Sequence, residues 1–251
     1  MSDFVVVIPS RYASARLPGK PLLELNGKAM IQHAYERGIE SGASEVIIAT
    51  DDERIAEVSE AFGATVCMTR EDHQSGSERI AEVADILDWD DTKVVVNLQG
   101  DEPTMPAALI NQCAALLRDE SADIGTLASP FSSAEDFQNP NCVKVVRDMQ
   151  GHALYFSRAS IPYARDPEKR ATAQDNALHH HGIYAYRCGV LRRFVNASPS
   201  PLEVCEQLEQ LRALSLGLTI AVDIPTLRPG IGVDTPDDLL RAEQELLLMQ
   251  G

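Results

Sequence analysis

Three cationic side chains stand close together near the start of this 251-residue chain. Arg11, Arg16 and Lys20 follow the apolar run at residues 4–8, and no acidic residue occurs between positions 4 and 23. Arginine offers planar, bidentate donors and lysine a flexible point charge, a combination that suits a polyphosphate. Gly19 lets the backbone bend closely around a ligand. The segment therefore predicts a binding site for a phosphorylated molecule.

A second interpretation of the same residues is a solvated basic loop whose cations pair with remote acids. The segment is not a P-loop of the form GxxxxGK[ST], which would need glycine at position 14 and Ser or Thr at 21. The chain has Ser14 and Pro21 instead. From spacing alone, both interpretations stay open.

Two aspartates each follow a short apolar segment, Asp101 after residues 94–99 and Asp234 after residues 230–233. Magnesium is often held by one or two carboxylates together with substrate phosphates and water. Asp101 could also be a simple turn residue, and Asp234 could help to start a helix. Because Thr235 already suits the helix N-cap, capping alone does not account for Asp234, and a role in metal binding stays open for both aspartates.

The elements that must position these residues follow an α/β pattern in the first half of the chain. Short β-branched runs alternate with segments of helical period, as in a parallel sheet covered on both faces. The expected strands are residues 4–8, 45–50, 65–69 and 93–99, and the expected helices are 29–42, 51–63, 77–87 and 106–119. Ligands of open α/β sheets bind at the carboxyl ends of the strands, which is where residues 9–21 fall.

The second half of the chain has more alternating strands, separated by loops. Strands are expected at 142–146, 153–157, 182–186 and 218–224, helices at 201–215 and 235–248, and a mobile excursion at 162–180. The predicted fold is one α/β domain over residues 1–251, with a mostly parallel, Rossmann-like sheet flanked by helices. Residues from about 142 to 200 would form a smaller mixed or antiparallel insertion, serving dimerisation or acting as a lid.

Composition excludes several classes of function. With 38 acidic against 22 basic residues and a net charge of −16, binding to nucleic acid or to an anionic membrane is disfavoured. No run approaches the roughly 20 apolar residues of a membrane helix, and no targeting signal stands out. The five cysteines are scattered and lack a C-x-x-C pair, which indicates reduced thiols in the cytoplasm.

Eight ordered blocks carry a specific resemblance across almost the whole chain. They are IPSRYASARLPGKPL (8–22), ATDDERI (49–55), SGSERIAEVA (75–84), NLQGDEP (97–103), YFSRASIP (155–162), HGIYAYR (181–187), QLEQLRAL (207–214) and GVDTPDDL (232–239). In these blocks the sequence resembles the sugar-nucleotide cytidylyltransferases, whose fold is of the nucleotide-diphospho-sugar transferase type. The YFSR, HGIYAYR and LEQLR blocks favour the branch that uses 3-deoxy-manno-octulosonate (Kdo).

The resemblance implies transfer of CMP from CTP to the anomeric hydroxyl of Kdo, with release of pyrophosphate, to activate Kdo for lipopolysaccharide synthesis. It also implies a homodimer that needs Mg²⁺. Two alternatives stay open: the same transfer onto a related acid sugar, such as 8-amino-Kdo or a sialic-type acid, and a catalytically silent nucleotide-binding protein. The silent protein should have lost a loop cation or a metal carboxylate, whereas this chain keeps them all.

By the same resemblance, site residues fall into three groups. The expected catalytic residues are Arg11, Arg16, Lys20, Asp101 and Asp234, with both aspartates binding the metal. The expected CTP-binding residues are Arg11, Ser14, Arg16, Lys20, Asp51, Ser77, Arg79 and Gln99. The expected sugar-binding residues are Arg158, which would pair with the sugar carboxylate, and His181, Tyr184, Tyr186, Glu209 and Gln210.

Two details of this assignment rest on local patterns. Loops 49–52 and 73–79 are the candidates for distinguishing cytosine from uracil, although Asp51 and its neighbour could simply cap the next helix. In the run at 179–181 adjacent histidines on an extended chain point to opposite faces, so one metal would not take all three. His181 is expected in the pocket, and His179 and His180 on the surface of a loop.

Overall fold

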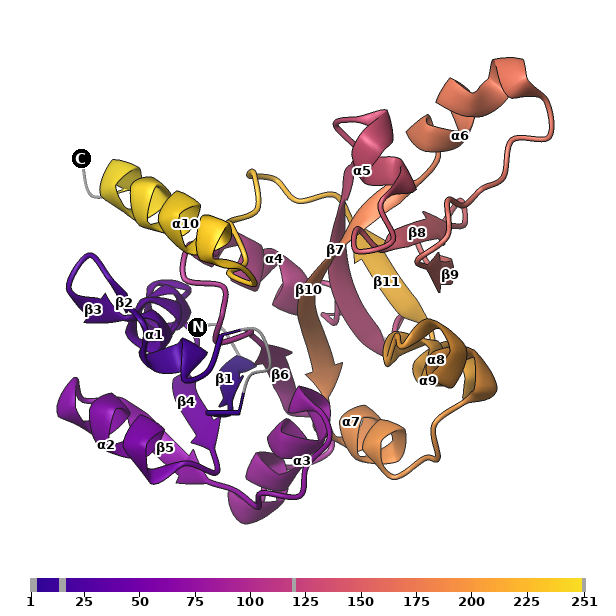
Figure 1. Cartoon of the computed structure of the whole chain (residues 1–251). Helices are drawn as coiled ribbons and strands as arrows, with labels where there is room; N and C mark the ends of the chain where they lie inside the picture. Colours follow the sequence, from indigo (N-terminus) through magenta and orange to yellow (C-terminus); the bar gives the residue numbers. More distant parts are fainter. Residues whose placement is uncertain (1–3, 14–16, 119–120, 250–251) are drawn as a thin grey trace.

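The computed structural model describes residues 4–13, 17–118 and 121–249. Its main sheet runs in the order β11-β7-β10-β6-β1-β4-β5 (Figure 1). These strands are β1 (Phe4–Ser10), β4 (Glu45–Thr50), β5 (Thr65–Met68), β6 (Val94–Asn97), β7 (Ile124–Pro130), β10 (Leu178–Arg187) and β11 (Ile220–Asp223). Pairing is parallel from β6 through β1 and β4 to β5, and between β7 and β11. The predicted fold class, an α/β fold with a mostly parallel sheet, is confirmed.

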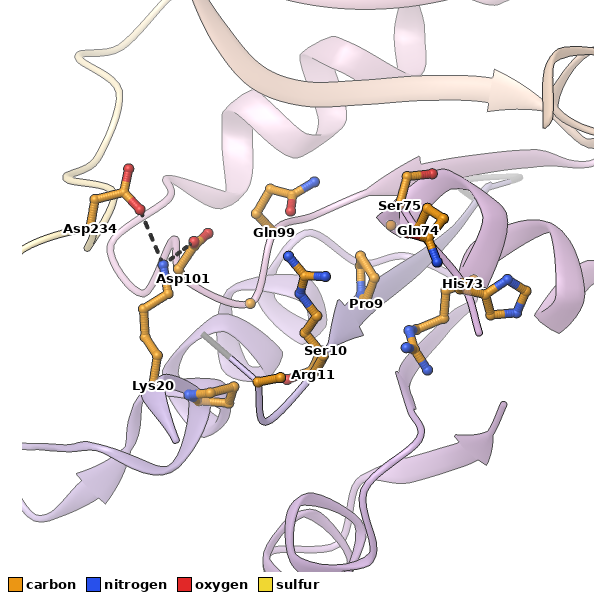
Figure 2. Close-up of a pocket in the computed structure, with 15 residues that line it drawn as sticks. Pro9, Ser10, Arg11, Lys20, His73, Gln74, Ser75, Gln99, Asp101 and Asp234 are labelled. Atoms are coloured by element: carbon orange, nitrogen blue, oxygen red, sulfur yellow. Dashed lines mark hydrogen bonds and ion pairs between the residues drawn. The ribbon is translucent and has the colours of Figure 1, made fainter. Parts of the chain in front are cut away.

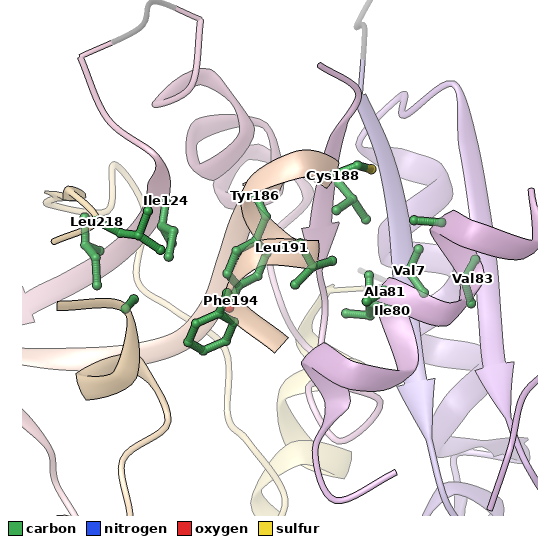
Figure 3. Close-up of a cluster of buried hydrophobic side chains, with 14 of the residues drawn as sticks. Val7, Ile80, Ala81, Val83, Ile124, Tyr186, Cys188, Leu191, Phe194 and Leu218 are labelled. Carbon is green, nitrogen blue, oxygen red and sulfur yellow. The ribbon is translucent and has the colours of Figure 1, made fainter. Parts of the chain in front are cut away.

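Alternate residues of β1 explain why helices cover both faces of the sheet. Val5 and Val7 face one buried cluster, to which α3 (Gly76–Ile86) and α7 (Cys188–Val195) contribute. Figure 3 shows Val7 in this cluster with residues of both helices. Val6 and Ile8 face a second cluster, to which α1 (Met30–Glu40), α2 (Glu53–Ala61) and α4 (Ala107–Ala115) contribute. Successive side chains of a strand point to opposite faces, so a continuous apolar strand needs two helical layers.

Strand β10 runs antiparallel to both of its neighbours, β6 and β7. Its first residues also pair with β8 (Lys144–Arg147), which forms a hairpin with β9 (Ala153–Ser157). Of the stretch proposed as an insertion at 142–200, β8 and β9 therefore branch from the main sheet at the start of β10, whereas the C-terminal part of β10 lies between β6 and β7. The division into one domain with a dimerisation or lid subregion stays a prediction.

The polar stretch 162–180, expected as a mobile excursion, contains regular structure. It holds a 3₁₀ turn (Pro167–Lys169), α6 (Arg170–Asp175) and the start of β10. Figure 1 shows α6 at the end of an arm that extends away from the sheet, near α5 (Ala134–Gln138). Strand β7, which the sequence pattern did not predict, lies between β10 and β11 in the main sheet.

The C-terminal segment folds back onto the N-terminal half. Helix α10 (Pro236–Met249) packs with the small hairpin of β2 (Glu24–Leu25) and β3 (Lys28–Ala29) around buried Leu25, Met30 and Val233. The remaining elements are a 3₁₀ turn at Lys20–Leu22, α8 (Pro201–Glu206) and α9 (Gln210–Ser215). In the described part of the chain, no helix has the length and apolar character needed to span a bilayer.

Candidate active site

The carboxyl ends of β1 and β6 border a cavity of about 420 Å³. Figure 2 shows its two ends, with Lys20, Asp101 and Asp234 gathered at one and His73 to Ser75 at the other. The lining residues are Pro9, Ser10, Arg11, Ala13, Lys20, Pro21, His73, Gln74, Ser75, Gly76, Arg79, Gln99, Gly100, Asp101 and Asp234. The cavity thus lies where an open parallel sheet is expected to bind its ligand.

The cationic loop after β1 is closed at its base by a hydrogen bond. Gly19 N donates to the carbonyl of Tyr12 at 3.1 Å. Gly19 has a φ of +68°, and a Cβ there would lie 3.0 Å from the Tyr12 ring, so glycine is needed for both reasons. The guanidinium of Arg54 covers that ring, 3.4 Å from its centroid. Ser14 and Arg16, two of the predicted CTP ligands, lie outside the described residues.

Lys20 and Arg11 present their charges to the cavity. Lys20 Nζ donates to Asp101 Oδ2 at 2.5 Å, to the carbonyl of Val233 at 2.8 Å and to Asp234 Oδ1 at 3.3 Å. In Figure 2 the exposed side chain of Arg11 reaches up beside Gln99. The structure therefore brings together four of the five residues predicted to be catalytic.

Asp234 reaches Asp101 because the segment before α10 lies against the loop after β6. Val233 N donates to the carbonyl of Asp101 at 2.9 Å. A Cβ on Gly230 would lie 2.4 Å from the carbonyl oxygen of Thr104, so only glycine allows this approach. Thr235 Oγ1 accepts a hydrogen bond from the Asp238 amide and caps α10, as the sequence predicts. The Asp234 carboxylate accepts a hydrogen bond from Lys20.

The donor set fits a magnesium ion that shares its coordination with a nucleotide. No cluster of three or more His, Cys, Asp or Glu side chains able to hold a metal occurs in residues 4–13, 17–118 and 121–249. Two carboxylates beside a phosphate-binding loop, however, suit Mg²⁺, which commonly takes its other ligands from phosphates and water. Nearby, burial together with the carboxylates of Asp101 and Asp234 raises the pKa of Glu102 to about 8.

The far end of the cavity is shaped by two carboxylates on α3. Glu82 accepts hydrogen bonds from His73 and from the Arg70 amide, at 2.5 and 2.9 Å, and Glu78 accepts one from the Gln74 amide at 2.7 Å. Burial opposes the effect, yet these hydrogen bonds hold the pKa of Glu82 below its usual value. The two carboxylates fix a loop that sequence reasoning had only marked as a region.

Three of the predicted CTP-binding residues, Gln99, Arg79 and Asp51, are fixed by contacts with other side chains. Gln99 lines the cavity and donates to Asn97 Oδ1 at 2.9 Å. Arg79 is almost fully buried and pairs with Asp51, whose Oδ2 is 3.1 Å away, and with Thr69. Asp51 therefore holds Arg79, while its neighbour Asp52 caps α2.

Ser77 is buried and donates to Glu209 Oε2 at 2.9 Å. Ser77 does not line the cavity. Its hydrogen bond instead connects the first turn of α3, at the His73–Ser75 end of the cavity, with Glu209, one of the predicted sugar-binding residues. Burial raises the pKa of Glu209, against the lowering effect of hydrogen bonds from Ser75 and Ser77. Gln210, the next residue, is also buried.

The guanidinium of Arg158 is anchored by backbone carbonyls. It donates to Glu206 at 2.7 Å, to Pro140 at 3.1 Å and to Gln207 at 3.4 Å. A guanidinium has five N–H donors, so these contacts leave two for a ligand carboxylate.

The other predicted sugar residues cluster on β10. The rings of Tyr184 and Tyr186 stack with centroids 5.8 Å apart, and His181 contacts Ser129 Oγ at 2.5 Å. Burial lowers the pKa of His181 to about 4, so the imidazole is neutral at physiological pH and can serve as a neutral hydrogen-bonding group.

The expectation that His179 and His180 lie on a loop surface was wrong. Both belong to β10, because the strand begins at Leu178. His179 stacks on Phe131, and His180 packs between Phe156 and Tyr184 and contacts Thr126 Oγ1 at 3.1 Å. Burial lowers the pKa of His180 to about 3. These histidines support the strand that carries the predicted sugar residues.

Several cavity residues were not singled out from the sequence, among them Ser10, His73, Gln74 and Ser75. Ser75 carries the best local signal, because Ser-x-x-Glu before an apolar run is the pattern of a helix N-cap, and its side chain does cap α3. The others depend on contacts between distant parts of the chain.

A mostly parallel α/β sheet with cations and paired carboxylates at its carboxyl edge is typical of a nucleotide-binding class of protein. A family profile for cytidylyltransferases matches residues 5–220, and the chain belongs to that family. A solved structure of CMP:2-keto-3-deoxy-manno-octonic acid synthetase complexed with CTP is 42% identical to it, with 100% of both chains covered and a TM-score of 0.90.

Two more distant structures support the fold alone. A cytidylyltransferase from Leptospira borgpetersenii serovar Hardjo-bovis is 16% identical, with 95% of this chain and 83% of that chain covered and a TM-score of 0.59. A nucleotidyl transferase from Methanothermobacter thermautotrophicus is 16% identical, with 98% of both chains covered and a TM-score of 0.65.

Proposed function

We propose that this cytidylyltransferase transfers CMP from CTP to the anomeric hydroxyl of Kdo. The observation that carries the proposal is the meeting of Arg11, Lys20, Asp101 and Asp234 on one wall of the cavity. The 42% identity to a CTP-bound synthetase of the same acid sugar supports it. In the reaction, the anomeric oxygen bonds to the α-phosphorus, the bond to the β-phosphate oxygen breaks, and pyrophosphate leaves.

The chain's own residues position the triphosphate and stabilise the charge that develops on it. Arg11 and Lys20 bind the phosphates, and we assign the same role to Ser14 and Arg16 from their positions in the loop. Asp101 and Asp234 would hold Mg²⁺, which when bound polarises the phosphate oxygens. Arg79, Asp51 and Gln99 would shape the base end, with Ser77 acting through Glu209.

The acid sugar would bind where β10 and α9 meet the nucleotide. The two N–H groups of Arg158 not bound to carbonyls would take the sugar carboxylate. His181, Tyr184, Tyr186, Glu209 and Gln210 would contact hydroxyls or shape the pocket. We also propose a homodimer, with residues of 142–200 in the interface or lid, and a cytoplasmic location, as the sequence pattern indicates.

The test measures pyrophosphate release from CTP with and without Kdo and Mg²⁺, using UTP as the control nucleotide. Release should require Kdo and metal, prefer CTP and fall by at least about 100-fold in Asp101→Asn, since one preorganised electrostatic group is worth that much or more. Release only with 8-amino-Kdo or a sialic-type acid would keep the transfer and change the sugar. Tight CTP binding without release for any sugar would refute the proposal and favour a silent nucleotide-binding protein.

A further inference from the structure

The ammonium of Lys20 is seated between the two carboxylates assigned to the metal. Its acceptors are one oxygen of Asp101, one of Asp234 and the carbonyl of Val233, at 2.5, 3.3 and 2.8 Å (Figure 2). Three acceptors match the three N–H donors of an ammonium. The lysine side chain is only 14% exposed, whereas the side chains of Asp101 and Asp234 are 33% and 53% exposed, so the carboxylates stay accessible to a ligand from solvent.

A divalent cation would need the same carboxylate oxygens. Because charges repel strongly at short range near a protein surface, the ammonium and a divalent ion exclude one another there. The Val233 carbonyl is fixed by the bond between Val233 N and Asp101, so the seat is held by the backbone and does not depend on side chains alone.

Lysine is suited to exchange between two partners. Its ammonium sits on a flexible four-carbon stem, and the same residue lines the cavity beside Arg11. Phosphate oxygens of a bound nucleotide can therefore replace the carboxylates as acceptors for the ammonium. The released carboxylates then become available to a metal ion.

We propose that Lys20 is an exchangeable counterion of the metal site, so that the nucleotide opens the Asp101–Asp234 pair to a divalent cation by drawing the ammonium away. This inference rests on the proposed function, since it takes both aspartates as metal ligands. The consequence is that metal binding without nucleotide is weak, and that nucleotide and metal bind cooperatively. By linkage, each raises the affinity for the other by the same factor.

The test measures Mn²⁺ binding to the full-length, nucleotide-free protein by electron paramagnetic resonance. Lys20→Met should bind Mn²⁺ about tenfold more tightly than the unaltered protein, because the ion no longer has to displace a charge-assisted hydrogen bond. The same variant should bind CTP less tightly in metal-free buffer. The two affinities thus move in opposite directions after one substitution.

Matched variants separate this exchange from a general change of charge. Lys20→Arg keeps the cation and should keep weak Mn²⁺ binding. Lys28→Met removes a lysine paired with Glu36 at 2.7 Å and should change neither affinity. Lys20→Gln provides a second neutral variant if Lys20→Met does not fold. Adding Asp101→Asn to Lys20→Met should abolish the gain.

Equal or weaker Mn²⁺ binding in a folded neutral variant would overturn the proposal and leave Lys20 as a phosphate ligand only. That outcome is distinguishable from failure of the proposed function. Pyrophosphate release by the unaltered protein reports the transfer reaction, whereas the metal titration contains no nucleotide and no sugar. A tenfold gain that survives Asp101→Asn would also count against the proposal, because the ion would then bind elsewhere.

Discussion

Lys144 is a fully buried lysine whose replacement should destabilise the protein strongly. Its Nζ donates to the carbonyls of Asn139 and Cys142, both at 2.8 Å, and of Arg158 at 2.7 Å. Three carbonyl acceptors match an ammonium, even though burial lowers the pKa of Lys144. The Lys144 ammonium thereby connects the loop before β8 to Arg158, the residue that follows β9. The guanidinium of Arg158 in turn donates to three other backbone carbonyls.

The expected loss of stability follows from two opposing contributions, the hydrogen bonds of the ammonium and the cost of its desolvation. Hydrogen bonds from a charged donor contribute about 1.5–3 kcal/mol each, and three of them must offset a desolvation cost of several kcal/mol. Replacing Lys144 by methionine removes the charge but leaves three carbonyls without their donor. We expect the free energy of unfolding to fall by about 3 kcal/mol, within the range for breaking a buried polar network.

Urea unfolding followed by circular dichroism measures this loss. Lys169→Met is the matched control, since that lysine is 72% exposed and its nearest carboxylate oxygen, on Asp166, is 3.7 Å away. Its effect should stay within about 0.5 kcal/mol. A loss below about 1 kcal/mol in Lys144→Met would refute the reasoning, because the ammonium would then not hold the three carbonyls in solution.

Two further predictions concern the buried histidines of β10 and the cationic loop after β1. The pKa values of His180 and His181, about 3 and 4, lie below the unfolded value of about 6.5, so the unfolded state binds protons first. The contribution of the two neutral histidines to the free energy of unfolding should be fully present above about pH 6.5. It should decrease toward pH 4 by up to about 1.4 kcal/mol per pH unit for each histidine. In His180→Gln the slope should be shallower, and an unchanged slope would contradict the assignment. Gly19→Ala and Gly27→Ala both place alanine at positive φ, +68° and +78°, but only the first meets Tyr12. Calorimetry should show weaker CTP binding for Gly19→Ala alone, and equal weakening in both variants would argue against the loop contact.

The parallel half of the fold could be predicted because its central strands β1, β4 and β6 are largely buried on both faces. A run such as FVVVI in β1 needs two helical layers, and its neighbours β4 and β6 have the same composition. Strand β7 escaped prediction because IGTLASP contains small and polar residues. One face of β7 packs against α4 and the residue that follows it, where a Cβ on Gly125 would lie 2.9 Å from Leu116, a contact that no local pattern reveals.

The candidate site likewise contains residues that local patterns predict and residues that only the packing of distant elements brings into contact. That Arg11, Lys20, Asp101 and Asp234 lie together could be predicted, because they follow strands or precede a helix. The link from Ser77 to Glu209 spans 132 residues, and the enclosure of His180 depends on Phe156 from another strand. Contacts of this kind are created by the packing of elements, so residue type and spacing alone did not indicate them.

Charge balance explains how a strongly acidic chain keeps cations at its nucleotide site. The ammonium of Lys20 pairs with acids 81 and 214 residues away in the sequence, so the two interpretations of the loop are compatible. Removing the ammonium leaves the carboxylates of Asp101 and Asp234 without their shared counterion, and like charges at short range repel one another. CTP alone would draw the ammonium from the carboxylates, and a metal ion alone would expel the ammonium. CTP and a metal ion together supply negative charge for the Lys20 ammonium and positive charge for the two carboxylates. The arrangement therefore favours the metal–nucleotide complex over either component.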